Sequence, residues 1–266
     1  MSHQPRKRFG QHFLHDPVVI RRIVAAVAPQ PSDRLVEIGP GEGAITIDLL
    51  RAAGRLDAVE LDRDLVGPLQ ERCAGIGELR VHGADALRFD FCSLAPPGEH
   101  LRIVGNLPYN VSTPLLFHLL DQLGCIRDMH FMLQKEVVER MAARPGGKSY
   151  GRLSVMLQAR CAVTRLFDVG PGAFRPPPKV DSSVVRLAPL ERPPEIGDAA
   201  TFARVVLAAF SQRRKTLRNS LKGLLDEGEI AGLGIAPSVR PEQLPLEDFV
   251  ALARACKVHS ATRDRE

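Results

Sequence analysis

Apolar residues occur along the chain in short runs that alternate with longer stretches in which they recur every three or four positions. The short runs, bounded by turn residues, predict buried strands, and the longer stretches predict amphipathic helices. Strands are expected near 35–38, 56–61, 79–82, 101–104 and 129–133, with helices at 44–53, 65–74 and 114–123. This alternation is typical of a doubly wound α/β fold with a parallel sheet and helices on both faces.

The pattern extends at both ends. Asp16 and Pro17 precede apolar residues at helical spacing, which predicts a capped helix before the first strand. Two further strand-like runs, 162–169 and 183–187, are joined only by a turn and a proline-rich loop. Because no crossover helix fits between them, we expect these two strands to pair antiparallel.

The chain changes character near residue 190. Residues 190–194 include two adjacent prolines and indicate a linker. Beyond it, helices are expected at 199–211, 214–225 and 246–257. The sequence therefore predicts a Rossmann-like α/β domain at 1–190 and a small all-helical domain at 191–266.

With 44% hydrophobic and 25% charged residues, the composition is that of an ordinary globular protein, and the net charge of +5 permits a polyanionic partner. The five cysteines are scattered without a C-x-x-C pair, so we expect free thiols in a reducing compartment and no zinc site. No secretory signal or bilayer-spanning apolar run is present, which predicts a cytoplasmic protein that contacts no membrane. No cluster of Cys or carboxylate residues completes a metal site, so we also expect that the protein binds no metal.

A glycine-rich turn, 39–43, follows the first strand, and glycines there let the backbone approach a ligand closely. Glu60 closes the next strand, where it can accept both hydroxyls of a ribose. NAD and S-adenosylmethionine both fit this pair. The G-x-G-x-G spacing and the preceding Glu37 favour the methyl donor. Asp85 follows the third strand and is a candidate to bind the cofactor's adenine, with a helix N-cap as the alternative.

The tetrapeptide Asn106-Leu107-Pro108-Tyr109 follows the fourth strand. The Asn106 side-chain oxygen and a backbone carbonyl of Leu107 or Pro108 can accept the two hydrogens of an exocyclic amine, and the Tyr109 ring can stack on the base. The alternative is an ordinary strand-to-helix connection capped by Ser112 or Thr113.

Basic residues recur after position 210, and no acidic residue occurs between 199 and 225. At helical spacing they form one charged face, suited to RNA phosphates. A solvated charged face is the alternative. The candidate RNA-binding residues are Arg213, Arg214, Lys215, Arg218 and Lys222.

With these motifs in this order, the chain resembles the ribosomal RNA adenine dimethyltransferases over nearly its whole length. Residues 9–14 (FGQHFL) resemble the family's N-terminal cofactor lid, 105–110 (GNLPYN) its catalytic loop, and 173–182 (AFRPPPKVDS) its second base-stacking loop. Residues 210–219 resemble the branch that modifies small-subunit rRNA, the KsgA/RsmA type. The macrolide-resistance branch, which modifies large-subunit rRNA, shares the earlier motifs but usually lacks this one.

The resemblance implies that a monomer transfers methyl groups from S-adenosylmethionine to N6 of two adjacent adenosines in the 3′-terminal hairpin of 16S rRNA, within a pre-30S particle. It implies a catalytic set of Asn106, Leu107, Pro108, Tyr109 and Phe174, in which Tyr109 and Phe174 sandwich the base. Phe174 as a packed loop anchor is the alternative. Many relatives carry Asn where this chain has His12. The implied cofactor contacts are Gln11, His12, Leu14, Gly39, Gly41, Glu60, Asp85 and Asn106.

Other functions remain open at this point. They are a large-subunit rRNA methyltransferase, a DNA adenine methyltransferase and a binding or assembly factor whose catalysis is secondary. An NAD-linked oxidoreductase is the weakest, because no acid or base for hydride transfer is evident.

Overall fold

The computed structural model describes residues 12–212 and 214–263. The chain forms two compact units, one of Met1–Val138 with Thr164–Pro189 and the other of Glu139–Val163 with Leu190–Glu266. Residues 139–163 precede the linker but belong to the second unit, unlike the sequence-based division at 190. The reason is packing, because Val155 and Ala159 are buried in one core with Phe202.

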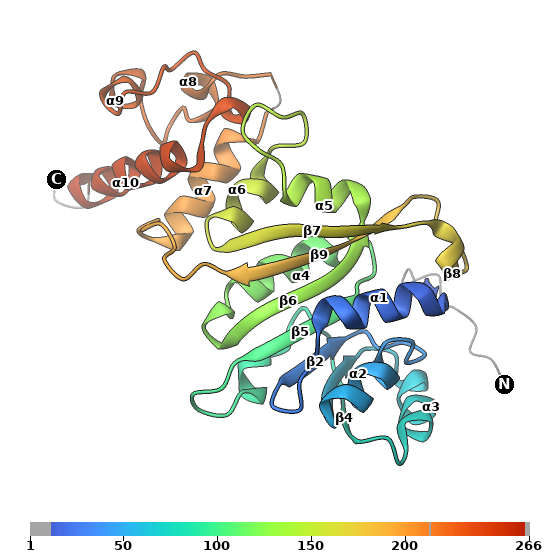
Figure 1. Ribbon diagram of the computed structural model, residues 1–266. Coiled ribbons are helices and arrows are strands. Elements are labelled where there is room, and N and C mark those ends of the chain that lie inside the picture. Colours follow the sequence, from blue (N-terminus) through green and yellow to red (C-terminus); the bar gives the residue numbers. More distant parts are fainter. Residues whose placement is uncertain (1–11, 213, 264–266) are drawn as a thin grey trace. The chain divides into compact units, whose positions relative to one another are not determined.

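The first unit is built on a mixed seven-stranded sheet, with strand order β4-β3-β2-β5-β6-β9-β7 (Figure 1). β2 to β6 are parallel, and β9 pairs antiparallel with β6. The predicted parallel sheet with an antiparallel strand is confirmed. The strands are β2 (Arg34–Ile38), β3 (Arg55–Glu60), β4 (Glu78–Gly83), β5 (Leu101–Asn106), β6 (Ile126–Gln134), β7 (Cys161–Val169) and β9 (Ser182–Pro189).

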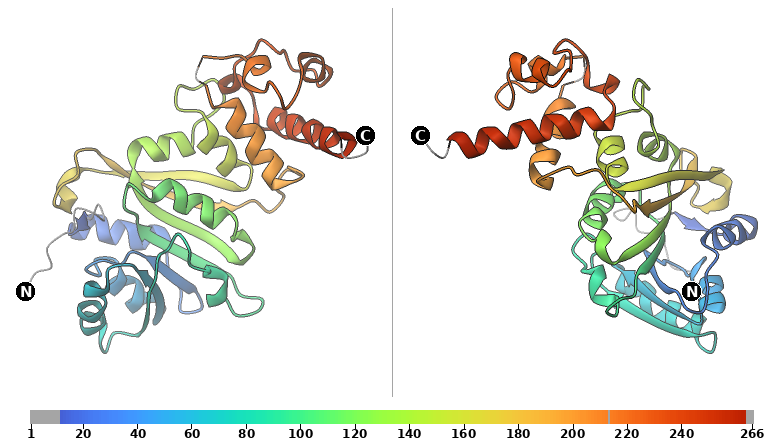
Figure 2. Two further views of the ribbon diagram at one scale, coloured as in Figure 1. Left: turned by 180° about the vertical axis from the view of Figure 1, so that it is seen from behind. Right: turned by 60° about the vertical axis from the view of Figure 1, so that its left-hand side comes forward.

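Helices cover both faces of this sheet, with α1 and α4 on opposite sides (Figure 2). Asp16 caps α1 as predicted, since its carboxylate accepts hydrogen bonds from the backbone N–H groups of Val18 and Val19. The helices and 3₁₀ turns of this unit are α1 (Pro17–Val27), α2 (Thr46–Ala53), α3 (Arg63–Cys73), η2 (Phe91–Leu94), α4 (Ser112–Leu120), η3 (Leu123–Cys125) and η4 (Pro171–Ala173).

A second, two-stranded sheet joins the start of the described chain to a distant loop. β1 (Phe13–Leu14) pairs antiparallel with β8 (Phe174–Arg175), so that Phe13 lies opposite Arg175 and Leu14 opposite Phe174. Strands of two residues have no measurable periodicity, and the sequence did not predict them.

A buried ion network holds α1 and the sheet together at the amino ends of the strands. Arg102 on β5 contacts Asp33 at 2.7 Å and Asp128 on β6 at 2.9 Å. Its remaining guanidinium nitrogen donates to the Val27 carbonyl at the end of α1. Because every charge in this group has a partner, burial of the arginine is tolerated.

The second unit is helical, with a core that includes Phe202, Val205 and Phe249. The predicted helix at 214–225 is wrong in extent, because only Leu217–Ser220 is helical. Arg214 has a φ of 78° and Gly223 a φ of 90°, and neither value is compatible with a right-handed helix. The elements are α6 (Arg152–Gln158), α7 (Ala199–Ala209), α8 (Leu217–Ser220), α9 (Glu227–Gly232), η5 (Pro241–Gln243) and α10 (Leu246–Arg263), with α5 (Lys135–Met141) spanning both units.

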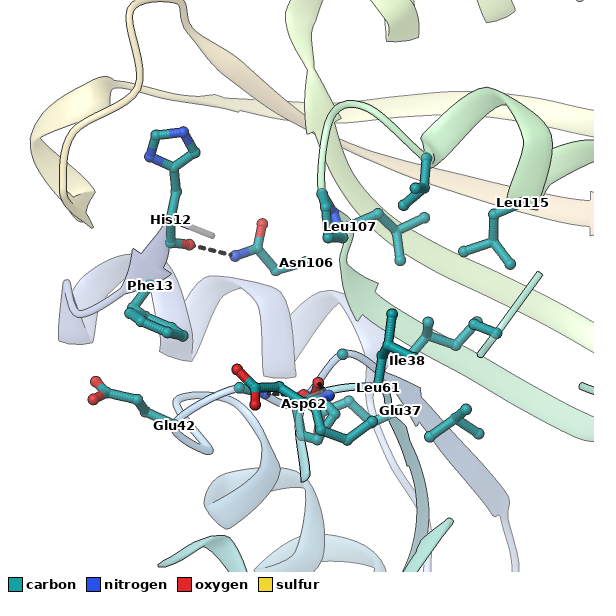
Figure 3. Close-up of a pocket in the computed structure, with 18 of the residues that line it drawn as sticks. His12, Phe13, Glu37, Ile38, Glu42, Leu61, Asp62, Asn106, Leu107 and Leu115 are labelled. Carbon is teal, nitrogen blue, oxygen red and sulfur yellow. Dashed lines mark hydrogen bonds between the residues drawn. The ribbon is translucent and has the colours of Figure 1, made fainter. Parts of the chain in front are cut away.

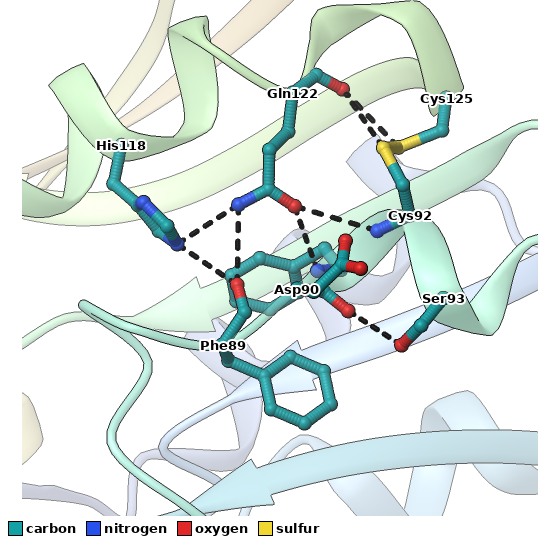
Figure 4. The surroundings of a disulfide bond; sticks show 8 residues. Phe89, Asp90, Cys92, Ser93, His118, Gln122 and Cys125 are labelled. Carbon is teal, nitrogen blue, oxygen red and sulfur yellow. Dashed lines mark hydrogen bonds between the residues drawn. A yellow bond between two sulfur atoms is a disulfide. The ribbon is translucent and has the colours of Figure 1, made fainter.

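The expectation that all cysteines are free is wrong for two of them. Cys92 and Cys125 form a disulfide across 33 residues, whereas Cys73, Cys161 and Cys256 are buried free thiols. The parallel pairing of β5 with β6 brings the preceding turns η2 and η3 together. Sequence spacing does not reveal this pairing. Around the bond, the Gln122 side-chain oxygen accepts from the Phe91 backbone N–H at 2.7 Å (Figure 4).

We predict that reducing this bond lowers the stability of the first unit. Tethering 33 residues removes conformational freedom from the unfolded chain, worth about 3–4 kcal/mol in the chain-entropy model. Urea unfolding with and without reductant measures the difference, and thiol titration in denaturant should find three reactive groups before reduction and five after. A Cys92→Ser/Cys125→Ser variant should show no response to reductant. Five reactive thiols at the outset would contradict the pairing.

Candidate active site

A cavity lies at the carboxyl edge of the parallel strands, the usual ligand position in an open α/β sheet (Figure 3). It is lined by the ends of β2, β3 and β5, by the turn after β4 and by residues 12–14. The predicted cofactor residues Leu14, Gly39, Gly41, Glu60 and Asp85 all border it, and so do His12 and Asn106. The tetrapeptide predicted to be catalytic also reaches it through Leu107, Pro108 and Tyr109.

The glycine turn is shaped by backbone conformations that other residues avoid. Gly39 and Gly41 have φ values of 66° and 57°. A Cβ on Gly41 would also lie 3.2 Å from the Phe13 ring. The Gly41 N–H donates to Glu60 at 3.1 Å, so the turn is tied to the acid on the neighbouring strand.

Glu60 is almost fully buried and is held by two backbone groups. Its other oxygen accepts from the Asp62 N–H at 2.8 Å. Each carboxylate oxygen therefore has one fixed donor and one further acceptor site, as the predicted ribose contact requires. Burial raises the pKa of Glu60, while the backbone donors lower it.

Glu37 is buried at the floor of the cavity, 1% exposed, and burial raises its pKa to about 8. The charge of Glu60 raises this pKa further. Glu37 therefore carries a proton in the folded protein near neutral pH, and a cation placed beside it would favour its ionised form.

The charge of the cavity separates the two cofactors that the sequence left open. The lining holds five acidic residues, and none of its described residues is Lys or Arg. A pyrophosphate would be repelled by those acids that are ionised, whereas a sulfonium with an ammonium group is attracted. The acidic lining thus favours S-adenosylmethionine over NAD. The five acids are Glu37, Glu42, Glu60, Asp62 and Asp85.

Asp85 caps a turn and not a helix, and its predicted contact with adenine stays a prediction. One carboxylate oxygen accepts from the Leu87 N–H at 3.0 Å and so stabilises the turn. The same side chain borders the cavity. A local turn contact therefore does not exclude adenine binding.

Asn106 is oriented by a contact that the sequence did not reveal. Its side-chain Nδ2 donates to the His12 backbone carbonyl at 3.1 Å (Figure 3). Because a carbonyl only accepts hydrogen bonds, this contact fixes which end of the amide faces His12. The Asn106 Oδ1 is then the end of the amide that remains available as an acceptor.

His12 is itself held in place. Its Nδ1 lies 2.7 Å from the Pro176 carbonyl and must be the donor in that contact. An asparagine at this position could donate to the same carbonyl. The His12 ring also lies 5.6 Å from the Tyr109 ring, and the Tyr109 hydroxyl is 2.8 Å from the Ser182 Oγ.

The model of the family described as "Ribosomal RNA adenine dimethylase" matches residues 2–257. The chain belongs to the ribosomal RNA adenine dimethylase family. It is 61% identical to the ribosomal RNA small subunit methyltransferase A of Methylococcus capsulatus over 96% of this chain and 98% of that protein. The corresponding protein of Nitrosococcus oceani is also 61% identical, over 96% and 97%.

Solved structures agree. A dimethyladenosine transferase from Plasmodium falciparum has a TM-score of 0.76 and 28% identity, covering 91% of this chain and 96% of that one. The 23S rRNA methyltransferase ErmE, at 24% identity and a TM-score of 0.70, covers 92% and 99% and shares the fold. The predictions of a Rossmann-like methyltransferase, of S-adenosylmethionine and of a small-subunit rRNA adenine dimethyltransferase are confirmed.

The structure places one predicted residue of this dimethylase away from the cavity. Phe174 is 3% exposed and packs in the hydrophobic core with Leu14 and Val184. On β8 it points inward, while the exposed Arg175 points outward. This placement favours the alternative of a loop anchor over the expected sandwich.

The basic residues do not share a helical face as predicted, because α8 is too short. Arg214, Lys215, Arg218 and Lys222 are exposed, and Arg218 lies 3.5 Å from Glu227. Their contact with RNA stays a prediction. Arg213 and Gln11 lie outside the described residues.

Two absences hold for the described part of the chain. Its side chains form no cluster of three or more metal ligands. None of its helices has the length and apolar character needed to cross a bilayer.

We predict that Glu37 makes stability depend on pH. Its pKa in the folded protein is about 8, above the ordinary 4.5. The contribution of protonated Glu37 to the free energy of unfolding is therefore fully present below pH 4.5 and is lost as the pH rises through 8. Glu37→Gln removes the ionisation. Urea unfolding at several pH values should show that the free energy of unfolding of the variant rises relative to that of the wild type between pH 5 and 8. Parallel profiles would contradict the assignment.

We also predict that Phe174→Leu keeps methyl transfer close to that of the wild type, because leucine fills most of the core volume. Phe174→Ala should lose about 3–5 kcal/mol of unfolding free energy, as expected for a large buried ring. Melting and single-turnover assays separate the two effects. A large loss of turnover in a stable Phe174→Leu protein would restore the stacking role.

Proposed function

We propose that this chain adds two methyl groups to N6 of each of two adjacent adenosines in the 3′-terminal hairpin of 16S rRNA. The observation that carries the proposal is Asn106 at the rim of an acid-lined cavity, with its amide nitrogen bound to His12 and its oxygen left as an acceptor.

The amino nitrogen of adenine is a weak nucleophile because its lone pair is delocalised into the ring. The Asn106 oxygen and a carbonyl of Leu107 or Pro108 accept its two hydrogens and turn the lone pair toward the reactive methyl. S-adenosylmethionine, when bound, supplies that methyl on a sulfonium, which keeps the bonding electrons as the methyl leaves. Orientation and electrostatics then provide most of the acceleration. The proton departs afterwards without a strong base.

The same arrangement serves the second methylation. A monomethylated amine has one hydrogen left, and a single neutral amide acceptor still binds it. A carboxylate at this position would lose the contact with the His12 carbonyl, because it has no N–H to donate.

The target adenine must leave its stack to reach the cavity. Tyr109 is half-buried at the cavity rim and offers an aromatic surface for the extruded base. Base–aromatic stacking contributes on the order of 1–3 kcal/mol. The exposed basic residues of the second unit are proposed to hold RNA phosphates.

The small-subunit target is favoured over the large-subunit one by the relatives at 61% identity, whose names specify the small subunit. We further propose that the substrate is a pre-30S particle in the cytoplasm and that the protein acts as a monomer. No metal is needed, because the sulfonium already activates the methyl group.

We predict that Asn106→Ala binds S-adenosylmethionine within a few-fold of the wild type but transfers methyl on the order of 100-fold more slowly. The assay uses 30S particles that lack the modification, with labelled methyl donor and mapping of the modified bases. Asn106→Asp is the matched variant. It keeps the size but loses the donor to His12, and should also be slow.

Labelling confined to large-subunit RNA or to DNA oligonucleotides would reject the proposed substrate. Near wild-type turnover by Asn106→Ala would remove Asn106 from the mechanism. An Asn106→Ala protein that did not methylate but still supported ribosome assembly would favour a binding or assembly role.

A further inference from the structure

Tyr109 is the one aromatic side chain that the catalytic loop presents at the cavity, and it is fixed at both ends. At the backbone end, the Ser112 Oγ donates to the Tyr109 carbonyl at 3.2 Å. At the ring end, the hydroxyl lies 2.8 Å from the Ser182 Oγ, 73 residues further along the chain. Burial raises the pKa of Tyr109, so the phenol keeps its proton and remains able to donate.

Ser182 is a rigid partner for this hydroxyl. It is fully buried as the first residue of β9, where it lies opposite Gln134 of β6. Its neighbours are fixed as well. The Asp181 carbonyl accepts from the Lys135 N–H at 2.9 Å, and the Ser183 Oγ donates to Asp168 at 2.5 Å.

We propose that Ser182 is a positioning residue for methyl transfer. It holds the plane of the Tyr109 ring, and through it the orientation in which the extruded adenine stacks before Asn106. The inference rests on the proposed function and deepens it. Residues 173–182 then act at the site through a serine hydroxyl and not through Phe174, whose ring lies in the core.

The geometry explains why a hydroxyl, and not only a ring, is present at position 109. A phenylalanine would offer the same stacking surface but could rotate about its Cα–Cβ bond. A hydrogen bond to the sheet removes that freedom before the base arrives, which is preorganisation.

The test is a double-mutant cycle of Tyr109→Phe and Ser182→Ala on unmethylated 30S particles. Each single change should lower kcat/KM by about 3- to 10-fold, the range of one neutral hydrogen bond. The double variant should be no worse than the worse single one, because both changes remove the same contact. Affinity for S-adenosylmethionine should be unchanged, and Ser182→Thr should recover activity.

The matched control is Ser183→Ala. This serine is equally buried and adjacent on β9, but its hydroxyl binds Asp168. Combined with Tyr109→Phe it should give additive losses. A direct measure of stacking uses 2-aminopurine in place of the target adenosine, since its fluorescence falls when it stacks. Ser182→Ala and Tyr109→Phe should both raise that fluorescence, and Ser183→Ala should not.

If Tyr109→Phe and Ser182→Ala lower kcat/KM additively, Ser182 does not act through Tyr109, and the inference is overturned. If Ser182→Ala does not fold, unchanged 2-aminopurine fluorescence in Tyr109→Phe overturns it equally. Failure of the proposed function looks different. In that case the wild type itself leaves the small-subunit adenosines unmethylated, and the inference falls with it.

Discussion

The hydrogen bond from Asn106 to the His12 carbonyl is the contact on which the chemistry of this site depends. An amide can face a ligand with either end, and only one end accepts hydrogens from an amine. The backbone carbonyl of His12 fixes which end of the Asn106 amide faces the ligand. The position of His12 is itself fixed, because its ring donates to the Pro176 carbonyl and because β1 pairs with β8.

The charged residues at the two ends of the parallel strands in the first unit are arranged differently. At the amino ends of the strands, Arg102 is paired with Asp33 and Asp128, so the charge there is neutralised and structural. At the carboxyl ends, Glu37 and Glu60 lie close together without a basic partner among the described lining residues. Glu37 therefore stays protonated in the free protein near neutral pH, and a cation that enters the cavity favours its ionised form.

Sequence reasoning succeeded where a regular pattern determines the structure. Strand and helix periodicity placed the sheet, and Asp16 before Pro17 located the start of α1. It failed where the outcome depends on contacts between distant segments. The pairing of Cys92 with Cys125, the burial of Phe174 against Leu14 and the hydroxyl contact of Ser182 with Tyr109 each join segments far apart in the sequence. The leucines after Arg214 have helical spacing, but the helix ends at Ser220 and Gly223 then takes a positive φ.

Gly105 shows how little room the fold leaves at its reactive end. A Cβ at this position would come within 2.7 Å of the Ile38 carbonyl, which is backbone and cannot move aside. Any larger residue would push β5 away from β2 and carry Asn106 with it. Attempts to redesign this protein for another base therefore have to leave residue 105 untouched and work from the residues beyond it.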